Sequence, residues 1–118
     1  MPTRMEYIGA YAKGWTEGDA QAILEACAPD YFIDDPRQPH KVTRDEFGAY
    51  LKDLVEEATE EAGGKPGDPF MAITDVLVQA DHALVSCWWH IPGLGISGAG
   101  LIRVGDRGVE SEKIAYYG

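Results

Sequence analysis

The sequence has no long apolar run, and basic residues are few. No stretch approaches the roughly 18 consecutive apolar residues of a membrane-spanning helix, and residues 1–9 lack a basic region followed by an apolar one. Only 10 Lys and Arg stand against 20 Asp and Glu, which gives a net charge of −10. Such a surface repels the phosphate backbone of nucleic acids. We therefore expect a cytoplasmic protein that binds neither nucleic acid nor membrane.

Cysteine and histidine are also scarce. Cys27 and Cys87 each stand alone in apolar surroundings, which favours buried free thiols over a disulfide or a metal site. The three histidines, His40, His82 and His90, do not show the spacing of metal ligands. We expect neither a metal ion nor a cofactor.

What the sequence does contain is a clear order of helices followed by strands. Two capping boxes, at residues 3–6 and 43–46, predict helix starts, and apolar residues at helical spacing follow each box. Between them, Asp19 caps a short helix that Pro29 closes, and a short extended piece follows. After a turn-rich segment at 63–69, the segments with strand character are residues 70–79, 83–91, 96–104 and 109–117. This order predicts one α+β domain over 1–118, with three N-terminal helices packed on a curved antiparallel sheet.

Both faces of the predicted sheet carry large apolar side chains. Within 83–91, Val85, Cys87, Trp89 and Ile91 alternate with Leu84, Trp88 and His90. Helices can cover only one face, so we expect the other face to pack against a second copy of the chain, as a homodimer. If the more apolar set meets the helices, Trp88 and His90 lie in the dimer contact. In the next strand, Gly98 and Gly100 predict a sharp bend.

A spaced pattern from Tyr11 to Pro36 resembles the start of the nuclear-transport-factor-2-like superfamily, which includes ketosteroid isomerases and polyketide cyclases of the SnoaL type. The pattern consists of Tyr11 on the first helix, a Trp-x-x-Gly-Asp turn at 15–19, the pair Asp30-Tyr31 and the close Asp34-Asp35-Pro36. The later order of helix and strands also fits, so the resemblance covers essentially the whole chain. It implies a conical α+β fold around an internal pocket. Because such folds host many chemistries and also plain binding modules, it does not select one activity.

The resemblance to ketosteroid isomerases implies specific roles. The spacing from Tyr11 to Asp35 matches, without a gap, that family's spacing from its oxyanion-holding tyrosine to its proton-abstracting aspartate. By resemblance, Asp35 is the general base at a carbon beside a carbonyl, and Tyr11 hydrogen-bonds the developing enolate oxygen. Asp34 is the weaker candidate, because adjacent strand residues face opposite sides. The residues expected to contact the substrate are Trp15, Tyr31, Tyr50, Trp88, His90 and Tyr116.

One element of the family pattern is missing. Ketosteroid isomerases carry a second oxyanion donor, a carboxylic acid on a late strand, but this sequence has no Asp or Glu between His82 and Gly105. Ser86, Trp88 and His90 share one strand face and could supply the missing donor, with His90 also able to act as an acid or base near neutral pH.

Two functions remain open from the sequence. The first is a cofactor-independent isomerase, cyclase or dehydratase that acts on a small apolar molecule with a carbonyl group. The alternative is a noncatalytic ligand-binding or dimerisation module that keeps only the fold.

Overall fold

The computed structural model describes residues 2–61 and 70–117, and the predicted turn segment 63–69 lies outside them. The described residues form the helices α1 (Arg4–Glu17), α2 (Ala20–Glu25) and α3 (Arg44–Glu61), the strands β1 (Cys27–Asp34), β2 (Val42–Thr43), β3 (Ala72–Val78), β4 (Leu84–Ile91), β5 (Ile96–Gly105) and β6 (Gly108–Tyr117), and the short 3-10 helix η1 (Pro92–Leu94). The predicted α+β class is confirmed.

Local signals set the ends of the first two helices. Thr3 and Glu6 form the predicted capping box at the start of α1, and Gly18 ends that helix with a left-handed backbone, φ 67°. The carboxylate of Asp19 then accepts the amide of Ala22 at the start of α2. α2 ends earlier than Pro29 requires, because the chain from Cys27 onward already pairs in the sheet.

The third helix also begins at its predicted cap, although the contacts differ from a full capping box. Glu46 accepts the backbone amide of Thr43 at 3.2 Å, as predicted, but the Thr43 hydroxyl points to the same carboxylate at 2.9 Å. The helix therefore starts at Arg44, with Thr43 still paired to Phe32 of β1.

The sheet has the order β2-β1-β6-β5-β4-β3. The strands β3 to β6 form the predicted antiparallel meander, whereas β1 runs parallel to β6, so the sheet is mixed. In this parallel pairing Ile33 lies opposite Glu112 and Asp34 opposite Lys113. It brings the segment that ends at Asp35 beside the last strand of the chain.

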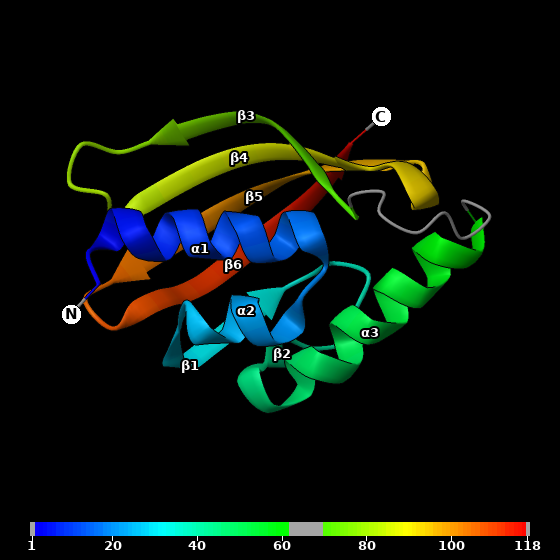
Figure 1. The fold of residues 1–118 in the computed structure, drawn as a ribbon, viewed down its shortest axis with the longest axis horizontal. Coiled ribbons are helices and arrows are strands. Elements are labelled where there is room, and N and C mark those ends of the chain that lie inside the picture. Colours follow the sequence, from blue (N-terminus) through cyan, green and yellow to red (C-terminus); the bar gives the residue numbers. More distant parts are fainter. Residues whose placement is uncertain (1, 62–69, 118) are drawn as a thin grey trace.

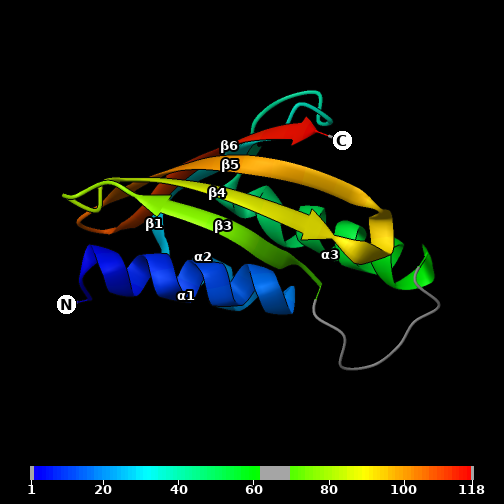
Figure 2. The same ribbon diagram turned by 90° about the horizontal axis from the view of Figure 1, so that it is seen from above.

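Helices cover one face of the sheet, which we call the inner face (Figures 1 and 2). The core lies between this face and the helices, and its side chains without solvent exposure include Ile23, Ile33, Phe47, Leu51 and Val109. In β4 the inner set is Val85, Cys87, Trp89 and Ile91. No helix among the described residues is long and apolar enough to cross a membrane.

The opposite, outer face keeps large apolar groups in solvent. Leu77 is 71% exposed, Trp88 41% and Tyr117 50%. Together with the inner set, these residues show why the sequence could not decide which face the helices cover, because both carry the side chains that a core needs.

Candidate functional site

A pocket opens between α1, α3 and the inner face of the sheet. The empty volume of this pocket, including its open mouth, is about 720 Å³. The members of its wall with an aromatic ring or a carboxyl group are Tyr11, Trp15, Tyr50, Trp89, Glu112 and Tyr116, and the others are aliphatic or sulfur-containing. An apolar wall with a few polar groups is the usual form of a small-molecule site.

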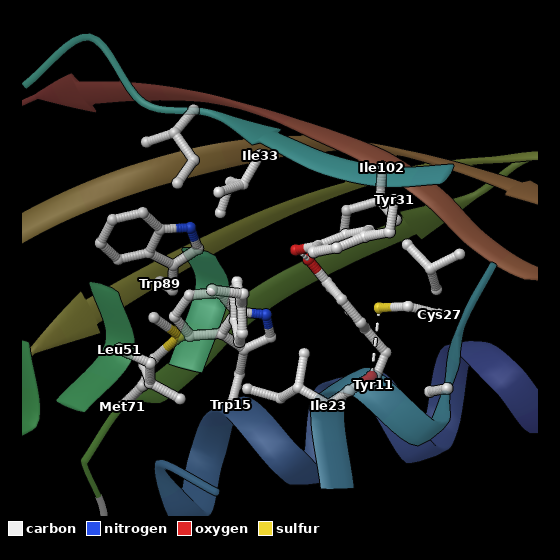
Figure 3. Close-up of a cluster of buried hydrophobic side chains, with 14 of the residues drawn as sticks. Tyr11, Trp15, Ile23, Cys27, Tyr31, Ile33, Leu51, Met71, Trp89 and Ile102 are labelled. Carbon is white, nitrogen blue, oxygen red and sulfur yellow. Dashed lines mark hydrogen bonds between the residues drawn. The ribbon is translucent and has the colours of Figure 1, made fainter. Parts of the chain in front are cut away.

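Tyr11 and Glu112 form the polar centre of this pocket. The Tyr11 hydroxyl donates to Oε1 of Glu112 at 2.5 Å and lies 2.7 Å from the hydroxyl of Tyr31. All three side chains are buried, at 2%, 4% and 1% exposure. Figure 3 shows the hydroxyls of Tyr11 and Tyr31 meeting between the helix and the sheet. The three groups form a hydrogen-bonded row in which each hydroxyl has one proton to give.

Burial changes the proton affinity of each group in this row. Desolvation raises the pKa of Glu112 to about 7; the hydrogen bond from Tyr11 lowers it and the nearby charge of Asp35 raises it. Burial, with the charge of Glu112 added, also raises the pKa of Tyr11 and of Tyr31 above its ordinary value. At neutral pH both phenols therefore stay protonated, while Glu112 is present in both its protonated and its ionised form.

The position of Glu112 depends on a glycine in the neighbouring strand. Glu112 of β6 pairs with Ile102 of β5, and Gly100 of β5 pairs with Ile114 of β6. A Cβ at Gly100 would overlap Oε2 of Glu112, so the carboxyl group occupies the space that a side chain at residue 100 would fill. The bare backbone at Gly100 thus makes room for the acid.

The acid beside Tyr11 comes from β6, the strand that follows the predicted acid-free segment between His82 and Gly105. Alternation along β6 is the signal that could have found it, because Glu112, Ile114 and Tyr116 share a strand face. Because Ile114 and Tyr116 point toward the core, a carboxyl group on the same face of the strand is expected to be buried.

Asp35 lies at a second polar centre, next to the wall of the pocket. Its Oδ2 accepts the hydroxyl of Tyr50 at 2.7 Å, and its Oδ1 accepts the hydroxyl of Tyr116 at 2.8 Å and the backbone amide of Arg37 at 2.9 Å. Asp35 is 2% exposed. Burial, with the hydrogen bond to Asp35 next, raises the pKa of both tyrosines, which keeps them protonated donors.

Most of the predicted site residues gather around the pocket. Tyr11, Trp15, Tyr50 and Tyr116 line it, Tyr31 stands behind Tyr11, and Asp35 stands behind Tyr50 and Tyr116. Tyr11 and Asp35 are thus both buried beside the pocket, but each belongs to its own hydrogen-bonded group. Among the described residues no hydrogen bond joins the two groups.

Trp88 and His90 require a correction, because the structure places them on the outer face. Trp88 is 41% exposed, and Nδ1 of His90 lies 2.9 Å from Oγ of Ser97 on that face. Neither residue lines the pocket. They alternate with Cys87, Trp89 and Ile91, which meet the helices, so Trp88, His90 and Ser86 cannot supply the missing donor.

The described residues contain no group of three or more His, Cys, Asp or Glu side chains that could hold a metal ion. Both cysteines are free and buried, and burial raises the pKa of each thiol to about 12. Neither thiol is ionised at neutral pH, so neither is a ready nucleophile.

Comparisons with known proteins identify the family and the fold. The model of the family described as SnoaL-like domain matches residues 8–115. A comparison with curated proteins gives no match. Among solved structures, the epoxide hydrolase/cyclase-like enzyme SalBIII, described in pyran ring formation in the polyether salinomycin, has a TM-score of 0.70 at 15% identity, covering 97% of this chain and 90% of its own.

Two further solved structures share the fold. A protein with a ketosteroid isomerase-like fold from Catenulispora acidiphila, in complex with trimethylamine, has a TM-score of 0.66 at 18% identity, covering 97% of this chain and 87% of its own. A nuclear-transport-factor-2-like protein of unknown function from Cytophaga hutchinsonii has a TM-score of 0.65 at 10% identity, covering 99% and 92%. These likenesses show the fold alone. Because the family model spans nearly the whole chain, the protein belongs to the SnoaL-like domain family.

Proposed function

We propose that the protein is a cofactor-independent isomerase, cyclase or dehydratase that moves a proton on a small apolar molecule with a carbonyl group. The observation that carries this proposal is the pairing of Tyr11 with Glu112 at 2.5 Å inside an otherwise apolar pocket. A neutral phenol and a protonated carboxylic acid side by side are two donors for one developing oxyanion.

In this mechanism the carbonyl oxygen of the substrate replaces Glu112 Oε1 as the acceptor of the Tyr11 hydroxyl, and protonated Glu112 donates a second hydrogen bond to the same oxygen. As a proton leaves the adjacent carbon, negative charge develops on that oxygen, and the two donors stabilise it. Glu112 donates only while it is protonated, so its pKa of about 7 makes this stabilisation strongest below neutral pH. Tyr31 supports Tyr11 by holding its hydroxyl at 2.7 Å.

Asp35 is the proposed base, as the resemblance to ketosteroid isomerases implies. A carboxylate has about four acceptor positions, and three of those on Asp35 are occupied, two on Oδ1 and one on Oδ2. One position on Oδ2 remains to accept a proton. Tyr50 and Tyr116 stand between this carboxylate and the pocket, so one of them has to turn aside for the base to reach the substrate.

A noncatalytic ligand-binding module is the second candidate. The observation that favours it is the same set of three hydrogen bonds to Asp35, because they occupy three of the positions at which the carboxylate could accept a proton. Asp35 is also absent from the pocket wall.

Exchange of deuterium into cyclohexanone separates the two candidates. Transfer of a proton from the carbon beside the carbonyl can be followed by NMR in D₂O with this probe, whatever the natural substrate is. We expect the protein to accelerate exchange, Asp35→Asn to reduce the enhancement about 100-fold or more, and Glu112→Ala to reduce it by a similar factor. Glu110→Ala, at an exposed acid of the same strand, is the matched control and leaves the rate unchanged.

The outcomes have distinct meanings. Exchange that survives Asp35→Asn would show that Asp35 is not the base. Bound cyclohexanone without any exchange above background would reject catalysis and favour the binding module. A decline of the exchange rate as the pH rises through about 7, absent in Glu112→Gln, supports the donor role of Glu112 because the amide does not titrate.

We further propose that two copies of the chain pair through the outer face of the sheet. Leu77, Trp88 and Tyr117 expose apolar surface there, and the helices lie on the other side. Sedimentation of the protein and of a Leu77→Glu variant tests this proposal. We expect a dimer that the variant weakens, and a monomer at all accessible concentrations of the unmodified protein would reject it.

A further inference from the structure

Two buried indole N–H groups in the pocket wall have no acceptor. Among the described residues, no hydrogen-bond partner lies within reach of Nε1 of Trp15 or of Trp89. Trp15 is only 6% exposed and Trp89 only 3%. A buried donor without a partner typically costs about 1–3 kcal/mol, so native structures keep few of them. Two such donors in one pocket require an explanation.

The two rings are held in place from several sides. Trp89 packs edge-on against Tyr116, with ring centroids 5.9 Å apart and planes at 89°. A Cβ at Gly98 would overlap the far edge of the Trp89 ring, so this glycine lets the indole lie against bare backbone. Trp15 packs edge-on against Tyr11 at 6.3 Å and against Phe47 at 5.7 Å. The indoles therefore keep a fixed orientation.

The donors come from opposite walls of the pocket. Trp15 belongs to α1 and Trp89 to β4, and each is next to one polar centre, Trp15 beside Tyr11 and Trp89 beside Tyr116. Figure 3 shows both indole nitrogens on the ring edges that are turned toward the hydroxyls of Tyr11 and Tyr31. Both rings line the pocket, so a ligand that fills it contacts one indole from each wall.

We propose that Trp15 and Trp89 are the ligand-orienting donors of this pocket, and that the ligand is a compact uncharged molecule with two acceptor oxygens, carbonyl or ether, near its opposite ends. This proposal rests on the proposed function only in that it uses the same pocket. An indole N–H donates and cannot accept, so it pairs with a ligand oxygen that has a free lone pair and excludes an ammonium group, which has none. Asp35 and Glu112 disfavour an anionic ligand, because one more negative charge in a buried site is repelled.

Three compounds of nearly equal shape test the proposal. Tetrahydropyran-4-one has a carbonyl and a ring oxygen at opposite ends, cyclohexanone has the carbonyl only, and methylenecyclohexane has neither. The readout is the set of indole N–H resonances of the ¹⁵N-labelled protein, assigned with Trp→Phe variants. The sequence contains three tryptophans. Trp88, on the outer face, is therefore an internal control in the same spectrum.

We expect tetrahydropyran-4-one to move the resonances of Trp15 and Trp89 downfield and to leave that of Trp88 in place. Cyclohexanone should move one of the two, and methylenecyclohexane should produce no downfield shift. Trp15→Phe and Trp89→Phe should each raise the Kd for tetrahydropyran-4-one about threefold to tenfold, the usual worth of one hydrogen bond, while Trp88→Phe should not.

Unmoved Trp15 and Trp89 resonances with all three compounds, or equal shifts with methylenecyclohexane, would overturn the proposal. Deuterium exchange into the same ketones keeps this result separate from catalysis. Downfield shifts without exchange would support the indole donors and count against catalysis. Exchange without downfield shifts would support catalysis and count against the indole donors.

Discussion

The pKa of Glu112 makes a quantitative prediction about stability. Replacement by Gln keeps the shape of the side chain and an acceptor for Tyr11, but removes the titration. Burial raises the pKa of Glu112 from an ordinary value of 4.5 to about 7 in the folded protein. The two pKa values differ by about 2.5. Because a difference of one in pKa corresponds to about 1.4 kcal/mol, ionisation of the buried side chain costs the folded state about 3 kcal/mol.

The sign follows from where the proton is held. Below about pH 4.5 Glu112 is protonated in both states and carries no cost. As the pH rises toward 7, the unfolded chain releases the proton while the folded protein keeps it, so the stabilisation from the raised pKa is lost. Relative to Glu112→Gln, the free energy of unfolding of the unmodified protein should fall by about 3 kcal/mol between pH 4.5 and pH 8, and then level off.

Urea unfolding followed by tryptophan fluorescence at a series of pH values measures this difference. The difference in free energy of unfolding between the two proteins, taken at each pH, removes the contributions of the other titrating groups to first order. Glu110→Gln, at an exposed acid of the same strand, controls for the loss of one negative charge. A difference between unmodified protein and Glu112→Gln that is independent of pH would refute the reasoning, because it would mean that the carboxyl group is hydrated in the folded protein.

Three further predictions concern the same region and the first helix. Tyr11→Phe removes the hydrogen bond that lowers the pKa of Glu112, so a carboxyl ¹³C titration should place that pKa above its value in the unmodified protein. Gly100→Ala puts a Cβ where the Glu112 carboxyl lies, and should cost about 1–3 kcal/mol in urea unfolding. In α1, Gly14→Ala should also destabilise, because a Cβ there would overlap a side chain of α2, whereas Gly9→Ala, with open space around it, should stabilise by about 0.5–1 kcal/mol.

Local patterns predicted the elements well because their causes lie within a few residues. A capping box at Thr3 and a left-handed glycine at Gly18 fixed the ends of α1, since both act through hydrogen bonds to adjacent turns. Alternation identified the four long strands. The Tyr11 and Asp35 positions likewise followed from a spaced pattern in the first third of the chain, and both are buried beside the pocket.

The parts that sequence reasoning missed all depend on contacts between distant segments. The expectation that Trp88 and His90 lie in the pocket fails because both faces of β4 are apolar, and only packing against the helices decides which face is inside. Glu112 was overlooked because a buried acid is tolerated only where Tyr11, more than 100 residues away, donates to it and where Gly100 leaves room.

The sequence by itself determined the helices, the strands and the α+β class of this protein, because capping, backbone preference and periodicity are properties of short segments. Only the tertiary structure decided which carboxyl group joins Tyr11 and which indoles face the pocket. The physical reason is that the cost of burying a polar group depends on partners that the register of β5 against β6 and the docking of α1 bring together.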